Sequence, residues 1–277
     1  MKICIAQINY NARDIQRHIE RIKNIINHYK ASDLIVFPEL ILHGHPSLEK
    51  PEGYLYRKMK VVNRFISKDL YQFVKNVRAQ VIIGELQQKG EKYYNKATFI
   101  ANDTIQSYTK THVHWTEHFV PGKELKVFDS TFGKIGITIC FDAAFPEVWR
   151  VLALKGAPLI VNISAVPKTF PVAYMWRRLS GAAICNQVFI IYANRPAPFF
   201  SGFSAVFNPQ GETLVNASGE ESIIEVDIDF NDVQRWRNDE KIYSYRRPLL
   251  YREIVRRPQC ALMTSDSQVR NIKMQKI

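Results

Sequence analysis

Residues 136–147 read GITICFDAAFPE and decide how the chain folds, because they join a short apolar strand to a helix. The pattern over Lys134–Ile139 predicts a strand. Pro146–Lys155 is typical of a helix, with proline in its first turn and glycine directly after its end. Cys140 falls at the junction. We therefore predict a strand–turn–helix unit that carries a thiol at its turn.

Strands and helices alternate along the rest of the chain as well. Apolar runs predict further strands at 2–9, 33–37, 80–84, 93–101, 104–109, 158–163, 188–193, 203–208, 212–216 and 221–227. Helical spacing of apolar residues predicts helices at 12–29, 61–76 and 174–186. Such alternation favours parallel sheets covered by helices, but the predicted hairpins do not suit a plain doubly wound sheet. The predicted fold class is α/β, a sandwich of two mixed sheets with helices outside.

The 277 residues contain no linker rich in glycine, serine or proline, so we predict one main domain at residues 1–253. Residues beyond about 231 read as irregular, and we interpret them as an arm rather than a core element. Residues 254–277 are expected to be a C-terminal tail, either an oligomerisation arm or partly ordered. Four aromatic residues of the arm are candidates for contact with a partner copy: Trp236, Tyr243, Tyr245 and Tyr251.

Composition and charge exclude several classes of protein. The formal net charge is +12, yet no nucleic-acid-binding motif accompanies it. Neither a signal peptide nor a membrane-length apolar run is present, so we expect a cytoplasmic protein without nucleic-acid or membrane partners. The four cysteines lie far apart, which argues against a metal cluster or a disulfide framework: Cys4, Cys140, Cys185 and Cys260.

Three predicted strands end in chemically reactive side chains. Glu39 follows the apolar run 34–37, Lys110 closes the strand 104–109, and Cys140 closes the strand quoted above. Because ligand sites of α/β sheets gather at the carboxyl ends of strands, we expect the three side chains to converge on one pocket.

The three residue types complement one another chemically. A thiol becomes a good nucleophile only when it is deprotonated, and a glutamate such as Glu39 can accept its proton. Lys110 offers a positive charge where an oxyanion develops, and the backbone N–H of Phe141 offers a second donor. The sequence therefore predicts a cysteine-dependent acyl-transfer site.

Phe37-Pro38-Glu39, residues 108–112 (YTKTH) and residues 136–147 together resemble the motifs of the nitrilase, or carbon–nitrogen hydrolase, superfamily, in its amidase and carbamoylase branch. The resemblance covers about residues 1–253. It implies a four-layer α-β-β-α sandwich, a homodimer or higher homo-oligomer, and no cofactor or metal. It also implies that Glu39 is the general base, Lys110 the stabilising cation and Cys140 the nucleophile, with Glu117 as a second glutamate that orients the lysine.

The same resemblance suggests the substrate. Nitrile-hydrolysing members usually carry Cys-Trp-Glu, whereas this chain carries Cys140-Phe141-Asp142, so we expect a small amide or carbamoyl compound. Members acting on carbamoyl amino acids carry arginines where this chain has Ala143 and Ala144, which predicts a substrate without a carboxylate at that point. Trp115 and Ala165 are further expected substrate-binding residues.

Three alternatives stay open at this stage. The first is nitrile hydrolysis on the same residues. The second is a metal-dependent hydrolase, because His43, His45, His112 and His114 fall in two short stretches whose spacing suits metal ligands. The third is a catalytically silent binding protein, which the joint presence of glutamate, lysine and cysteine disfavours.

Overall fold

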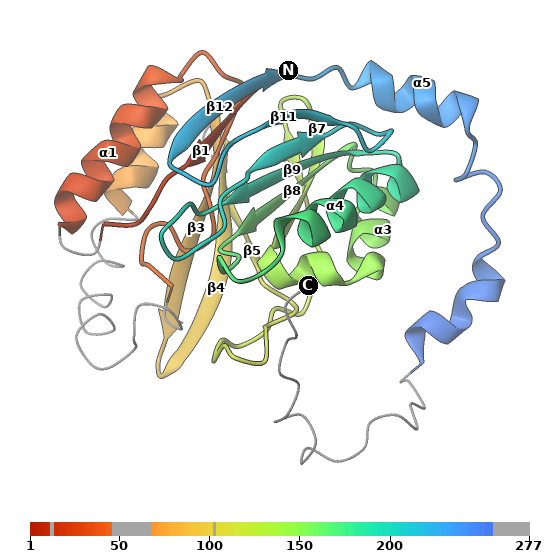
Figure 1. Cartoon of the computed structure of the whole chain (residues 1–277), viewed down its shortest axis with the longest axis horizontal. Coiled ribbons are helices and arrows are strands. Elements are labelled where there is room, and N and C mark those ends of the chain that lie inside the picture. The colour runs from red at the N-terminus through yellow and green to blue at the C-terminus, as the bar shows by residue number, and fades with distance from the viewer. Residues whose placement is uncertain (12–13, 46–67, 102–103, 257–277) are drawn as a thin grey trace. The chain divides into compact units, whose positions relative to one another are not determined.

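Two six-stranded mixed sheets lie face to face in the computed structural model, which describes residues 1–11, 14–45, 68–101 and 104–256 (Figure 1). The strands of the first sheet are, in spatial order, β12 (Ser222–Asp227), β1 (Lys2–Gln7), β2 (Leu34–Val36), β3 (Gln80–Lys89), β4 (Lys92–Ala101) and β5 (Thr104–Thr109). Those of the second are β11 (Thr213–Asn216), β10 (Ala205–Phe207), β9 (Phe189–Asn194), β8 (Leu159–Ser164), β7 (Gly133–Ile139) and β6 (Val127–Ser130).

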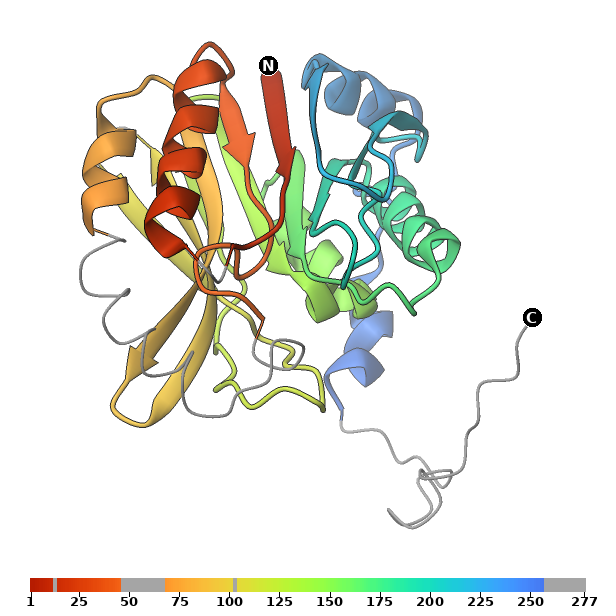
Figure 2. The same ribbon diagram turned by 60° about the vertical axis from the view of Figure 1, so that its left-hand side comes forward.

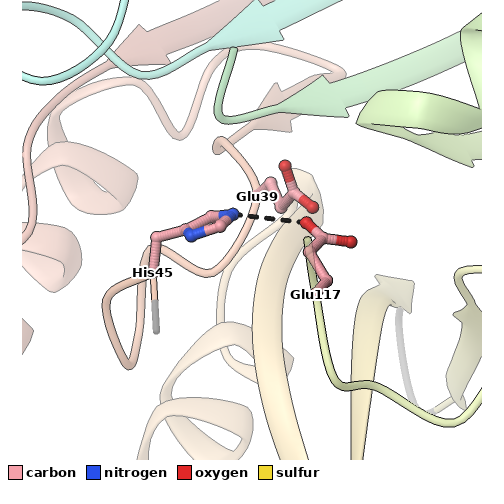
Figure 3. A group of neighbouring side chains, drawn as sticks. All are labelled: Glu39, His45 and Glu117. Carbon is pink, nitrogen blue, oxygen red and sulfur yellow. Dashed lines mark ion pairs between the residues drawn. The ribbon is translucent and has the colours of Figure 1, made fainter. Parts of the chain in front are cut away.

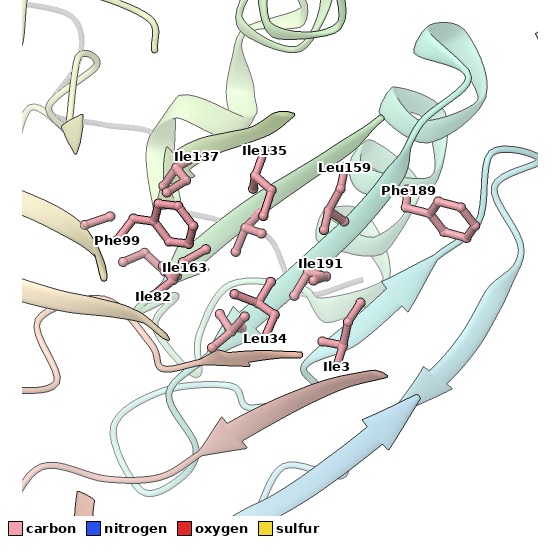
Figure 4. Close-up of a cluster of buried hydrophobic side chains, with 14 of the residues drawn as sticks. Ile3, Leu34, Ile82, Phe99, Ile135, Ile137, Leu159, Ile163, Phe189 and Ile191 are labelled. Atoms are coloured by element: carbon pink, nitrogen blue, oxygen red, sulfur yellow. The ribbon is translucent and has the colours of Figure 1, made fainter. Parts of the chain in front are cut away.

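The apolar core lies between the two sheets (Figure 4). Side chains alternate along a strand, so Ile3 and Ile5 of β1 belong to this inter-sheet core, whereas Cys4 and Ala6 belong to a second core beneath the helix layer. The inner strands β2 and β8 are buried along their whole length. This explains why their sequences are continuous apolar runs rather than alternating ones.

Helices form the two outer layers (Figure 2). α1 (Ile15–His28) covers the first sheet with a stripe of isoleucines, and the Asp14 side chain caps it by accepting a hydrogen bond from the Arg17 backbone N–H at 2.9 Å. A second helix at 68–75 lies on the same side. α3 (Pro146–Leu154) and α4 (Val172–Asn186) cover the second sheet. The predicted four-layer sandwich is confirmed.

One strand was not predicted, and two predicted elements include residues outside the described part of the chain. β6 was not predicted, because its four residues are too few for a clear period. The predicted helix 61–76 falls partly outside the described residues, and its described part is helical at 68–75. The predicted hairpin is present as β4 and β5, although residues 102–103 lie outside the described part of the chain.

The interpretation of residues beyond 231 as irregular is wrong, because α5 spans Asn231–Asp239. Its sequence, NDVQRWRND, is polar almost throughout, so it has no apolar stripe from which a helix could be predicted. Val233 nevertheless packs into the inter-sheet core beside Phe230, and its side chain is 4% exposed. The first turns of the expected arm therefore belong to the main body.

The chain divides into two units, Met1–Asn238 and Asp239–Ile277. In the second unit, a 3₁₀ helix, η2, spans Pro248–Val255. The Tyr251 hydroxyl accepts a hydrogen bond from the Arg247 backbone N–H at 3.1 Å, and the Arg246 guanidinium lies 5.5 Å from the centroid of the same ring. No helix among the described residues combines the length and apolar composition needed to cross a bilayer.

Candidate active site

The strand directions bring the C-terminal ends of four strands to the same side of the molecule. β2 and β3 run parallel, β4 runs antiparallel to β3, and β5 antiparallel to β4, so β5 points the same way as β2. In the facing sheet, β7 and β8 are parallel. The residues that follow these strands are Glu39 after β2, Lys110 after β5, Cys140 after β7 and Ala165 after β8.

Glu39 is fully buried in a tight turn that lies against β3. A Cβ atom at Gly84 would lie 2.3 Å from the Pro38 carbonyl oxygen, so only glycine lets this turn approach the sheet. The Glu39 Oε1 atom accepts hydrogen bonds from Asn95 Nδ2 at 2.6 Å and from Lys110 Nζ at 3.0 Å. Its second oxygen, Oε2, has no hydrogen-bond partner among the described residues.

Lys110 joins two carboxylates in the interior of the protein. Its Nζ atom lies 3.0 Å from Glu39 Oε1 and donates to Glu117 Oε2 at 2.8 Å and Oε1 at 3.0 Å. Burial alone would lower the pKa of Lys110, but the negative charges of Glu39 and Glu117 raise the pKa above its ordinary value. The ammonium group therefore stays charged at neutral pH.

Glu117 is the second glutamate of the network (Figure 3). It accepts hydrogen bonds from the His114 backbone N–H at 3.2 Å, and His45 Nε2 lies 3.4 Å from its Oε1. Burial raises the pKa of Glu117, but the His45 and Lys110 contacts outweigh burial and lower the pKa to about 2. Glu124, the next glutamate along the chain, lies on the surface beside Lys126, so the structure brings Glu117 and not Glu124 to Lys110.

Cys140 opens a 3₁₀ turn, η1 (Cys140–Ala144), and has a left-handed backbone with φ of 45°. A non-glycine residue in this region is strained by roughly 1 kcal/mol or more, which requires the surrounding bonds to hold the turn. Burial and the Glu39 charge raise the pKa of the Cys140 thiol, whereas the Lys110 charge lowers it. The thiol is therefore protonated at rest and needs a base. The Ala165 backbone forms a hydrogen bond to it.

The other predicted binding residues lie in two environments. Phe141 and Trp115 contact each other edge to face, with ring centroids 5.6 Å apart, and Trp115 also stacks on His114 at 3.8 Å. Trp115 is 79% exposed. Ala143, by contrast, is buried, and its carbonyl oxygen accepts a hydrogen bond from Trp149 Nε1 at 3.2 Å.

The alternative hypothesis, a metal site formed by histidines of the two stretches, is not supported among the described residues. His43 Nδ1 accepts a hydrogen bond from the Leu86 backbone, His112 contacts Asp142, and His114 contacts Thr116. Of the histidines in the described part of the chain, only His45 joins a group with metal-binding potential, together with Glu39 and Glu117. The Lys110 ammonium contacts both carboxylates of that group, so its positive charge already offsets part of their negative charge.

Three polar residues of this region were missed by sequence reasoning: Asn95, His45 as a partner of Glu117, and Asp142. Asn95 is buried in β4 but lies between Tyr94 and Lys96, which are only partly buried, so its sequence neighbours gave no signal. Asp142 lies within residues 136–147, but only one of its side-chain hydrogen bonds is local, the one from Ile139. Its other partners, Tyr108, Thr111 and His112, lie 30 to 34 residues earlier in the chain.

The fold and the site define an α-β-β-α sandwich protein with a buried carboxylate–ammonium network beside a cysteine. A family model described as carbon–nitrogen hydrolase matches residues 2–238, and the chain belongs to that family. The predicted membership is confirmed.

Individual relatives agree with this assignment. A protein named nitrilase from Pyrococcus abyssi is 28% identical over 268 residues, which cover 89% of this chain and 100% of the relative. The structure of a carbon–nitrogen hydrolase from Helicobacter pylori G27 matches with a TM-score of 0.84 and 21% identity over 93% of this chain and 98% of its own. A mutant amidase from Nesterenkonia sp. AN1, with an acetamide moiety covalently added at its active-site cysteine, matches with a TM-score of 0.73 and 21% identity over 89% and 97%.

Proposed function

We propose that the chain hydrolyses a non-peptide C–N bond of a small amide or N-carbamoyl compound through a thioester on Cys140. The observation that best supports this is the buried network in which Lys110 lies within 3.0 Å of oxygens of both Glu39 and Glu117. Such a network supports the proposal because a base and a fixed cation would then act on one thiol, whose pKa both Glu39 and Lys110 influence.

In the first half-reaction, Glu39 takes the proton from the Cys140 thiol. Its Oε2 atom is suited to this step, since Asn95 and Lys110 occupy only Oε1. The thiolate then attacks the carbonyl carbon, and the developing oxyanion is stabilised by Lys110 and by the backbone N–H of Phe141. Glu39 returns its proton to the departing nitrogen, which leaves as ammonia or an amine.

In the second half-reaction, water hydrolyses the thioester. Glu39 removes one proton from the water, the hydroxide adds to the thioester carbon, and the Cys140–carbon bond breaks. The thiolate recovers the proton from Glu39, and the acid product leaves. Glu117 orients Lys110 throughout, because its two oxygens accept from the same ammonium group.

The substrate carries no carboxylate beside the nucleophile turn. Ala143 and Ala144 offer no charged side chain there, so the chain has no bidentate clamp for an anion at these positions. We propose that the substrate is neutral, apolar or cationic at this point, with N-carbamoyl amines and simple aliphatic amides as the two candidate classes. A relative named nitrilase keeps nitriles as the alternative substrate.

A substrate panel tests this proposal. We expect kcat/KM for N-carbamoyl amines or aliphatic amides to exceed that for matched N-carbamoyl amino acids by about tenfold or more, the equivalent of one charge-assisted hydrogen bond. The measurement is ammonia release over matched amides, carbamoyl compounds and nitriles, with and without a chelator. A clear preference for the carboxylate-bearing compounds would contradict the substrate proposal, and activity lost to the chelator but kept after alkylation of Cys140 would contradict the thiol mechanism.

We also propose a homodimer whose interface includes α3 and α4, with residues 1–253 as the hydrolase domain. Both helices carry exposed apolar side chains, among them Leu154 of α3 and Tyr174 of α4, which are 45% and 53% exposed. We expect light scattering to give twice the chain mass of 32.2 kDa, and L154R to shift the mass toward one chain. The control is L214R in β11, where Leu214 is 43% exposed. A monomeric wild type would contradict the proposal.

A further inference from the structure

Asp142 is a fully buried carboxylate in the turn that follows Cys140, and the mechanism above gives it no role. Donors converge on both of its oxygens. Oδ2 accepts from the Ile139 backbone N–H at 2.9 Å and from the Tyr108 hydroxyl at 2.8 Å. Oδ1 accepts from Thr111 Oγ1 at 3.0 Å and from the His112 backbone N–H at 2.8 Å. Each oxygen is therefore tied to the segment that contains Lys110.

The bonds of Asp142 connect the two halves of the site. Ile139 immediately precedes Cys140, so its bond to Asp142 closes the strained nucleophile turn. Tyr108, Thr111 and His112 lie on either side of Lys110 in the chain. One carboxylate thus joins the backbone that carries the thiol in one sheet to the segment that carries the ammonium group in the other.

The His112 side chain adds a second tie between the same segments. Its Nδ1 atom lies 3.0 Å from Asp142 Oδ1, and an ionised carboxylate only accepts, so Nδ1 carries the hydrogen. The ring also stacks on Phe145, with centroids 3.9 Å apart and planes 23° apart. Phe145 follows η1 directly, so His112 contacts the nucleophile turn in its middle, at Asp142, and just beyond its end.

We propose that Asp142 is a positioning residue that fixes the Cys140 turn against the Lys110 segment, so that the thiol keeps its place beside the ammonium group. This inference rests on the hydrolase function proposed above. Asparagine at position 142 keeps the size of the side chain but replaces one acceptor oxygen with an NH₂ donor. That donor would face groups that are themselves donors, so at least one side of the junction must open.

The test compares D142N with wild type in two assays. We expect kcat for the best substrate of the panel to fall about 100-fold, the effect of roughly 1 Å of misplacement, while KM stays close to that of wild type. We expect the rate at which iodoacetamide alkylates Cys140 to fall in the same direction, because the thiolate moves away from Lys110. Both assays use a C185A/C260A background, in which Cys4 is buried and its pKa is raised by burial to about 12.

T138V is the matched control. Thr138 is also fully buried, lies on β7 two residues before Cys140, and forms hydrogen bonds to Val161 and Asn162 rather than to the Lys110 segment. We expect T138V to lower thermal stability and to leave kcat and the alkylation rate unchanged. If D142N also changed only stability, or if T138V reproduced the kinetic losses of D142N, the positioning role would be overturned.

Two further outcomes, a D142N variant that does not fold and a wild type without activity, still leave a test of the proposal. If D142N does not fold, T111V removes a single donor at the Lys110 end and is expected to give a smaller drop in both assays; wild-type values in both would overturn the proposal. If wild type hydrolyses no compound of the panel, the proposed function fails. The alkylation rates of D142N and T138V still decide the role of Asp142.

Discussion

Replacement of Cys140 by alanine is expected to lower kcat by about 10⁶-fold, the order of loss found when a covalent nucleophile is removed. The reason is that no neighbouring group replaces the thiol: Glu39 has no thiol to deprotonate, and Lys110 has no oxyanion to stabilise. C140A is expected to stay folded, since alanine fits the space of the thiol and every hydrogen bond of Asp142 remains. Ammonia release and thermal melting measure the two quantities.

C185A is the matched control for this variant. Cys185 is an exposed free cysteine at the end of α4, outside the network described above. We expect C185A to keep the wild-type kcat and C140A to lose it, and we expect mass spectrometry to detect an acyl adduct on Cys140 in wild type. Turnover near the wild-type rate in C140A would exclude the thioester mechanism, whatever the substrate.

The elements and the convergence of the site were largely predictable because they follow from local pattern. The continuous apolar run at 34–37 and the apolar residues before Cys140 each predicted a buried strand. Because ligand sites gather at the ends of strands, Glu39, Lys110 and Cys140 were expected in one region. The structure brings Glu39 and Lys110 into contact at 3.0 Å across 71 residues of chain.

The rest depends on contacts that no local pattern contains. Asp142 draws its donors from residues 108–112, and His45 reaches Glu117 only because the turn after β2 folds toward the segment after β5. The histidines show the same limit. Their spacing of two residues within each stretch was compatible with a shared metal ion, but each imidazole contacts a different polar partner. α5 was missed because a single buried residue, Val233, fixes it to the core.

Replacement of Lys110 by methionine is expected to lower kcat by about 10³-fold or more, because the variant loses the charge that stabilises the oxyanion. It is also expected to lower the free energy of unfolding at neutral pH by about 3–5 kcal/mol, the usual effect of removing one partner from a buried ion pair. Glu39 and Glu117 would then be two buried carboxylates without their shared cation. K126M is the control, since Lys126 forms its ion pair on the surface.

The pH dependence of stability distinguishes this account from simple loss of packing. In wild type the folded-state pKa of Glu117 is about 2, below its ordinary value of 4.5. The ionised Glu117 therefore stabilises the folded protein fully above pH 4.5, and this stabilisation is lost as the pH falls toward 2. Without Lys110, the same carboxyl should have a raised pKa, because burial and Glu39 both disfavour its charge. The folded variant then binds protons more tightly than the unfolded chain does.

The stability of K110M relative to wild type should therefore improve as the pH falls from 7 toward about 4.5, where protonation relieves the unpaired charge. Denaturant unfolding of wild type, K110M and K126M at the two pH values measures this difference. If K110M were less stable than wild type by the same free energy at both pH values, methionine would disturb packing alone, and Glu117 would not depend on Lys110 for its charge. A difference in stability that shrinks in acid would show that the ammonium group holds Glu117 ionised, so that the pair formed by Glu117 and Lys110 stays intact at neutral pH.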